Sequence, residues 1–93
     1  MTTYEALRHV ETERQFQNTK WGGIEGAWPI PDGVKLAVLL EEVGEVANAL
    51  LEGKREIDLR HELIQVAAVA TRWAETLGAS EKPIGFAEGD KLA

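Results

Sequence analysis

The sequence predicts an all-α fold, an antiparallel bundle of three main helices that is completed by oligomerisation. Apolar residues recur at helical spacing in three segments, and glycine-containing breaks separate these segments. The length of 93 residues fits one domain, covering 1–93. The last of the three segments is apolar on nearly all sides, which two neighbouring helices of so short a chain cannot cover. We therefore expect contacts with another subunit.

Composition excludes several classes of function. The absence of cysteine excludes disulfides, thiolate metal sites and cysteine nucleophiles. Zinc is disfavoured because only His9 and His61 offer an imidazole, and we assign neither a role. A net charge of −6 argues against a nucleic-acid partner, which requires a basic face. Without a membrane-length apolar run or the layout of a signal peptide, the chain is expected to be soluble and cytoplasmic, with no membrane partner.

The first predicted helix runs from about Thr3 to about Asn18. Thr2 and Glu5 have the spacing of a capping box, with Thr2 as the N-cap. The apolar residues of this helix are sparse and surrounded by charge, which indicates an outer helix with one modest buried stripe. That stripe consists of Tyr4, Leu7, Val10 and Phe16.

A long loop, 20–33, follows, because four glycines and two prolines prevent regular structure there. Loops of this length within compact domains are often functional. The loop carries Trp21 and Trp28. One interpretation is that these rings cap the open end of a small core. The other is that they form a stacking platform for a planar ligand such as a nucleobase.

The second predicted helix runs from about Val34 to Leu51 or Glu52, with Asp32 as N-cap and Gly53 as the C′ residue. Gly44 lies in its interior at a cost of about 1 kcal/mol relative to alanine. We interpret it as a point of close approach for another helix or a ligand. The apolar stripe of this helix contains Leu36, Leu39, Leu40, Val43, Val46, Ala47, Leu50 and Leu51.

The third predicted helix begins near Glu56 or Asp58 and ends near Leu77, with Gly78 as C′. Its near-continuous apolar surface predicts burial against both other helices. The narrow polar strip that remains contains His61, Glu62, Gln65 and Arg72. The tail, 79–93, is expected to be loosely ordered, with Ile84 and Phe86 docked on the body.

Three glutamates of the second helix, Glu41, Glu42 and Glu45, fall within one turn, where like charges repel. An antiparallel hairpin brings Glu45 opposite the region of Glu62, and Gln65 lies one turn further along. Carboxylates that converge from two facing helices commonly build metal sites in bundles. Mg²⁺ prefers such oxygen ligands together with substrate phosphates, so the pattern predicts a magnesium site.

The pattern Glu41-Glu42-x-x-Glu45, followed after sixteen residues by Glu62-x-x-Gln65, resembles the signature of the MazG-type all-α nucleoside triphosphate pyrophosphohydrolases. The resemblance covers about 32–77. It implies cleavage of a nucleoside triphosphate between the α and β phosphates, giving a monophosphate and pyrophosphate. It also implies dependence on Mg²⁺, with Mn²⁺ as a substitute, and assembly into a homodimer or homotetramer.

Carried over by position, Glu42, Glu45, Glu62 and Gln65 are expected to ligate the metal. Glu41 is expected to act with the first three in catalysis, as a further ligand or by orienting the attacking water. Gln65 stands where the family has aspartate. Its carbonyl can ligate a hard cation but brings no charge.

Substrate contacts are expected from two places. Trp21 and Trp28 would contact the base. Lys54 and Arg55, beyond the end of the acidic helix, are the first choices for the phosphates.

Two alternatives remain open. A protein of the same fold with Gln65 in its metal site binds nucleotide or metal without hydrolysing the nucleotide. Alternatively, the chain is an acidic helical interaction module whose glutamates face water.

Overall fold

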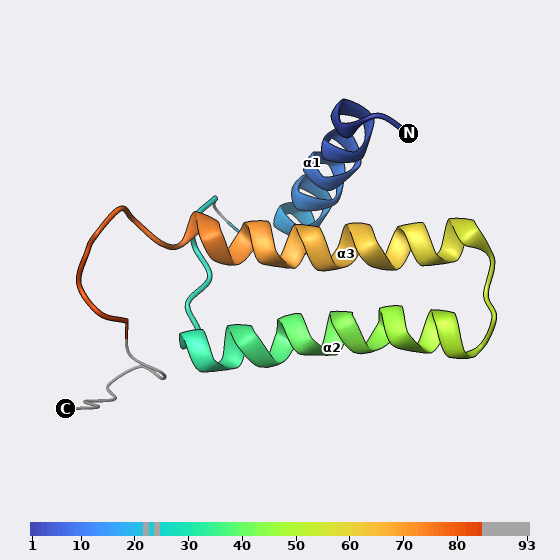
Figure 1. The fold of residues 1–93 in the computed structure, drawn as a ribbon. Coiled ribbons are helices and arrows are strands. Elements are labelled where there is room, and N and C mark those ends of the chain that lie inside the picture. Colours follow the sequence, from blue (N-terminus) through green and yellow to red (C-terminus); the bar gives the residue numbers. More distant parts are fainter. Residues whose placement is uncertain (22, 24, 85–93) are drawn as a thin grey trace.

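The computed structural model describes residues 1–21, 23 and 25–84, and their regular structure consists of three helices (Figure 1). These are α1 (Thr3–Lys20), α2 (Asp32–Leu51) and α3 (Glu56–Glu75). The prediction of an all-α, three-helix fold is confirmed for this part of the chain. Within it, no helix combines the length and the apolarity that crossing a bilayer requires.

Helices α2 and α3 lie side by side as an antiparallel hairpin, and α1 lies across α3 (Figure 1). Gly53 ends α2 with a φ of +61°, a left-handed conformation that side chains other than glycine rarely adopt. The backbone N–H of Lys54 donates to the carbonyl of Ala49 at 3.0 Å, which closes the turn. The predicted end of the second helix is confirmed. Helix α3 packs against both α1 and α2, as its apolar surface predicted.

Of the two predicted N-terminal helix caps, the structure confirms the one on α1 and not the one on α2. Thr2 caps α1 as predicted, because its Oγ1 accepts from the backbone N–H of Glu5 at 3.1 Å. The prediction that Asp32 caps α2 is wrong, since Pro31 is the N-cap and Asp32 is the first helical residue. Asp32 Oδ1 instead accepts from Trp73 Nε1 at 2.9 Å and from Lys35 Nζ at 3.5 Å. Asp32 therefore ties the start of α2 to the end of α3.

The apolar core of the single chain is small. Its buried apolar residues are Ala49, Ala68 and Val69, and no large side chain in the described residues is fully buried. The predicted buried stripe of α1 is wrong in part. Its members Tyr4, Leu7 and Phe16 are 71%, 61% and 58% exposed, whereas Arg14 and Gln17 are buried.

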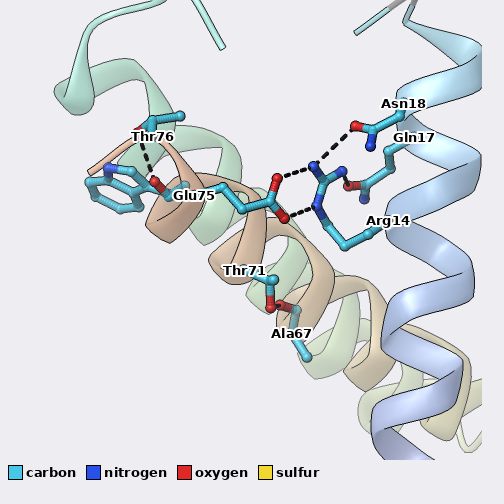
Figure 2. Close-up of polar contacts among 8 residues, drawn as sticks. Arg14, Gln17, Asn18, Ala67, Thr71, Glu75 and Thr76 are labelled. Carbon is cyan, nitrogen blue, oxygen red and sulfur yellow. Dashed lines mark hydrogen bonds and ion pairs between the residues drawn. The ribbon is translucent and has the colours of Figure 1, made fainter. Parts of the chain in front are cut away.

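Arg14 is buried because it is at the centre of a polar network (Figure 2). Its Nε donates to Glu75 Oε2 at 2.8 Å, and its Nη2 donates to Glu75 Oε1 at 2.5 Å. Gln17 Oε1 and Asn18 Oδ1 accept from the same guanidinium at 3.0 Å each. The hydrogen bonds from Arg14 hold the pKa of Glu75 below its usual value. The network joins the C-terminal half of α1 to the last turn of α3 through charge-assisted hydrogen bonds.

Several predictions for the end of α3 and the tail that follows it are wrong. The helix ends at Glu75, two residues before Leu77, and Thr76 is its C-cap. Gly78 does not take the left-handed conformation expected of a C′ residue. Ile84 is 73% exposed, so its predicted docking is wrong, whereas Phe86 lies outside the described residues.

Candidate functional site

The predicted metal-ligating residues lie along the seam between α2 and α3. Glu45 and Glu62 line one small cleft of about 90 Å³, which confirms that the hairpin brings Glu45 opposite Glu62. Glu42 and Gln65, one turn away from them along each helix, line a neighbouring larger cleft. The four residues thus share one seam but open into two adjacent depressions.

Glu42 carries the clearest electrostatic signature at this seam. Partial burial raises its pKa, and the negative charge of Glu62 raises it further. Glu45, Glu41 and Glu13 add smaller effects in the same direction. The carboxylates of α2 and α3 are therefore close enough to repel one another, as expected for groups that share a cation.

Glu13 was missed by the sequence analysis. It lies on α1, lines the larger cleft beside Glu42 and raises the pKa of Glu42. Only the packing of α1 on α3 brings it there, so spacing within α1 gave no signal. The cleft thus carries a carboxylate from each of α1 and α2 and an amide from α3.

These side chains supply the oxygen ligands that a hard cation prefers, but they are not already arranged around one common point. None of Glu41, Glu42, Glu45 and Glu62 has an ion-pair partner in the described part of the chain. Within the same residues, no three side chains among histidine, aspartate and glutamate are already placed to hold a metal ion. Glutamate side chains have several rotatable bonds, so binding would draw these carboxylates inward at the cost of rotamer entropy.

The larger cleft has the size and lining of a small-molecule site. Its volume is about 390 Å³, within the range of ligand pockets. Three aromatic rings and several polar side chains line it. The lining residues are Glu13, Phe16, Gln17, Lys20, Trp21, Trp28, Val38, Glu42, Gln65, Val69 and Arg72.

Both loop tryptophans line this cleft, but in different states. The guanidinium carbon of Arg72 lies 4.4 Å from the centroid of the Trp28 ring, and Lys35 Nζ lies 5.8 Å from it. Trp21 is 63% exposed, with Lys20 Nζ 5.0 Å from its ring centroid. Both rings therefore have a cation beside them, and Trp21 has most of its surface exposed.

The other predicted site residues lie further out. Lys54 lines the small cleft with Glu45 and Glu62, and its Nζ lies 3.5 Å from Glu52 Oε2. Arg55 is exposed and pairs with Asp58 at 3.0 and 3.1 Å, in the cap of α3. Glu41 is exposed and lines neither cleft.

Arg72, which the sequence analysis placed in the polar strip of the third helix without a role, has a distinctive position in the structure. It lines the larger cleft, and no carboxylate of the described chain pairs with it. Burial lowers its pKa most, and the neighbouring charge of Arg14 lowers it further. A guanidinium in this setting favours a ligand that brings hydrogen-bond acceptors or negative charge.

Comparisons of this chain with family models, with curated proteins and with solved structures find no match.

Proposed function

We propose that this protein is a Mg²⁺-dependent nucleoside triphosphate pyrophosphohydrolase that cleaves between the α and β phosphates. The observation that carries the proposal is the position of Glu42. It belongs to the acidic seam, and it lines the aromatic cleft. A cation-binding group and a base-sized cavity therefore adjoin, as a phosphorylated planar substrate requires. The resemblance of the glutamate pattern to the MazG-type signature supports the same reaction.

The residues suit phosphoryl chemistry, which depends on charge neutralisation and alignment more than on a covalent catalyst. Glu42, Glu45 and Glu62, with the Gln65 carbonyl, would hold Mg²⁺. When bound, the ion supplies charge neutralisation and acidifies the attacking water.

A carboxylate of this cluster would orient that water, and Glu41, which is exposed and lines neither cleft, is placed less well for this role than Glu42. The water oxygen attacks the α phosphorus, the bond from this phosphorus to the bridging oxygen breaks, and pyrophosphate leaves with that oxygen. A carboxylate of the cluster accepts the water proton.

Three polar residues on one side of α3 indicate the orientation in which a substrate would bind. Glu62, Gln65 and Arg72 are three and seven residues apart, so they lie on one side of the helix. Seven residues of helix correspond to about 10.5 Å along its axis. The phosphates would lie at the Glu62 and Gln65 end, and the base would lie toward Arg72.

The two tryptophans then take different roles in the proposal. Trp28 holds the Arg72 guanidinium in place through its ring. Trp21, whose ring is largely uncovered, supplies the stacking surface for the base. Lys54 and Arg55 become secondary, because Lys54 lies near Glu52 and Arg55 is engaged by Asp58.

One specific observation favours a second candidate, nucleotide and metal binding without hydrolysis. Gln65 lines the cleft beside Glu42, where the family pattern supplies a fourth carboxylate. An amide oxygen can ligate but is a poor base and lowers the total negative charge of the site. Calorimetry with a triphosphate whose α–β bridge cannot be hydrolysed separates binding from turnover.

Magnesium-dependent stabilisation tests the metal site itself. A cation that binds only the native state raises the melting temperature of the protein. We expect such a rise for the unmodified chain, its loss in Glu42→Gln and Glu45→Gln, and its retention in Glu11→Gln, which alters an exposed glutamate of α1 outside both clefts. An unchanged melting temperature in saturating Mg²⁺ would leave the acidic interaction module as the better account.

A further inference from the structure

Arg72 carries hydrogen-bond donors into the larger cleft, and no residue in the described part of the chain accepts from them. The arginines that donate side-chain hydrogen bonds there are Arg8, Arg14 and Arg55. The guanidinium of Arg72 instead lies over the ring of Trp28, 4.4 Å from its centroid. A cation–π contact engages the charge of a guanidinium but gives its five N–H donors no lone-pair acceptor. These donors are therefore left to meet water or a ligand.

The surroundings of Arg72 favour a ligand that brings acceptors. The side chain is partly buried, and this burial, followed by the nearby charge of Arg14, lowers its pKa. Glu75 acts on that pKa in the opposite direction, but both of its carboxylate oxygens already accept from Arg14. A partly desolvated donor without an acceptor costs free energy, which an incoming acceptor recovers.

The position of Arg72 along α3 suits the base of a nucleotide rather than its phosphates. Gln65 and Arg72 line the same cleft and are seven residues apart, which is about 10.5 Å along the helix axis. Metal and phosphates would lie at the Gln65 end, and the sugar separates the base from them. We take this orientation from the proposed function, on which the inference rests.

Among the bases, guanine offers the acceptor pattern that an arginine fork fits. Two neighbouring N–H donors of a guanidinium bind two adjacent acceptors in one plane, and guanine presents O6 and N7 side by side. Adenine has an amino group beside N7, so one of the two donors would face another donor. On the corresponding edge, thymine presents O4 as its one acceptor and cytosine presents an amino group.

We propose that Arg72 is the specificity-determining residue of the larger cleft and that it selects a guanine nucleotide, donating from two guanidinium N–H groups to O6 and N7 of the base. Contact with Trp28 restricts the guanidinium, so less side-chain entropy is lost when it binds. Trp21, which lines the same cleft and is 63% exposed, supplies the stacking face. The cleft volume of about 390 Å³ leaves room for a two-ring base.

Calorimetric titration of the unmodified chain in Mg²⁺ tests the base contact without any substitution in the protein. The probes are triphosphates with one sugar, an α–β bridge that cannot be hydrolysed, and guanine, hypoxanthine, 7-deazaguanine, adenine or cytosine as the base. Hypoxanthine keeps both O6 and N7, 7-deazaguanine keeps O6 and adenine keeps N7. Cytosine is included because its pairing edge carries two adjacent acceptors, N3 and O2. We expect guanine and hypoxanthine to bind alike, and roughly tenfold or more tightly than the other three.

Arg72→Met and Arg60→Met form a matched pair on α3. Arg60 is exposed and lines the separate depression that contains His9 and His61, not the larger cleft. Methionine keeps an unbranched stem that can pack on the Trp28 ring, while it removes the donors. We expect Arg72→Met to abolish the preference for guanine and to leave the affinity for adenine unchanged, whereas Arg60→Met should retain the preference. An equal loss for every base in Arg72→Met would overturn the proposal, because the guanidinium would then contact the phosphates.

The base preference and the proposed reaction fail separately. Guanine-selective binding without release of pyrophosphate supports the base contact and contradicts the reaction. Hydrolysis together with equal affinities for the guanine, 7-deazaguanine and adenine probes overturns the base contact and leaves the reaction, as does a preference for cytosine. Absence of binding by all five probes overturns both.

Discussion

Arg14 and Glu75 connect α1 to the end of α3 through two parallel hydrogen bonds of 2.5 and 2.8 Å (Figure 2). The guanidinium is buried and the carboxylate is partly exposed, so the pair is shielded from solvent more than a surface ion pair. Because the lining of the larger cleft depends on where α1 packs, this pair positions Glu13 and Phe16 there.

Removing the carboxylate should therefore be costly. Glu75→Ala leaves the Arg14 charge buried with only Gln17 and Asn18 as partners, and we expect a loss of about 2 kcal/mol, below the 3–5 kcal/mol typical of fully buried pairs. The exposed pair Arg8–Glu11 is the control, since Glu11→Ala should cost less than about 0.5 kcal/mol. Urea unfolding of the two variants measures both values. Equal losses would show that the Arg14 pair behaves as a surface ion pair.

The same pair predicts a pH dependence. The pKa of Glu75 is lowered in the folded state, so its contribution to stability is present above its unfolded pKa and is lost as the pH falls through its folded pKa. Glu42 has the opposite sign. Its folded pKa is raised, so the folded state binds its proton more tightly and stability falls as the pH rises above the ordinary glutamate range.

Unfolding free energies measured between pH 7 and pH 5 without divalent cations separate the two effects. Across this range we expect Glu42→Gln to remove a gain in stability on acidification that the unmodified chain shows. Glu11→Gln should preserve that gain. An identical pH profile for Glu42→Gln and the unmodified chain would contradict the mutual repulsion of the seam carboxylates.

Gly44 and Gly53 give a prediction with an internal control. An added Cβ at Gly44 meets no atom within 4 Å, so Gly44→Ala should stabilise the single chain by roughly 0.5–1 kcal/mol through helix propensity. Gly53 has a positive φ, so Gly53→Ala should destabilise. Thermal unfolding of both variants measures the difference. Destabilisation by Gly44→Ala would mean that another chain or a ligand approaches this position closely.

Gln65→Asp tests the composition of the metal site. An added carboxylate beside Glu42 should tighten Mg²⁺ binding and raise the pKa of Glu42 further in the absence of metal. Calorimetric Mg²⁺ titration of the variant and the unmodified chain gives the comparison. Weaker Mg²⁺ binding by Gln65→Asp would place position 65 outside the ligand shell.

The helices could be predicted from the sequence because the residues that begin and end each helix act on backbone groups only a few positions away. The Thr2 cap and the left-handed turn at Gly53 are set by neighbours in the chain, and both were predicted. The role of Asp32 was not, because its partner Trp73 is 41 residues away and competes successfully with capping.

Long-range partners also explain what the sequence could not indicate about the site. The antiparallel hairpin predicted that Glu45 lies opposite the region of Glu62, since both positions are counted from one turn, and both residues line the small cleft. Arg14 is buried only because Glu75 reaches it, and Glu13 approaches Glu42 only because α1 crosses α3. The spacing of apolar residues in α1 therefore indicated the wrong buried side. Arg72 became prominent only once its position over Trp28 and its lack of a described carboxylate partner were visible.

The measurement that tests the central claim most directly is product analysis after incubation of the purified protein with a panel of nucleoside and deoxynucleoside triphosphates in Mg²⁺. We predict that at least one substrate yields the monophosphate and pyrophosphate in equal amounts. Chelation of Mg²⁺ should abolish the reaction, Glu42→Ala and Glu45→Ala should each reduce it at least a hundredfold, and Glu11→Ala should leave it unchanged. Release of inorganic phosphate with a diphosphate, or no pyrophosphate from any nucleotide at high protein concentration, would contradict it.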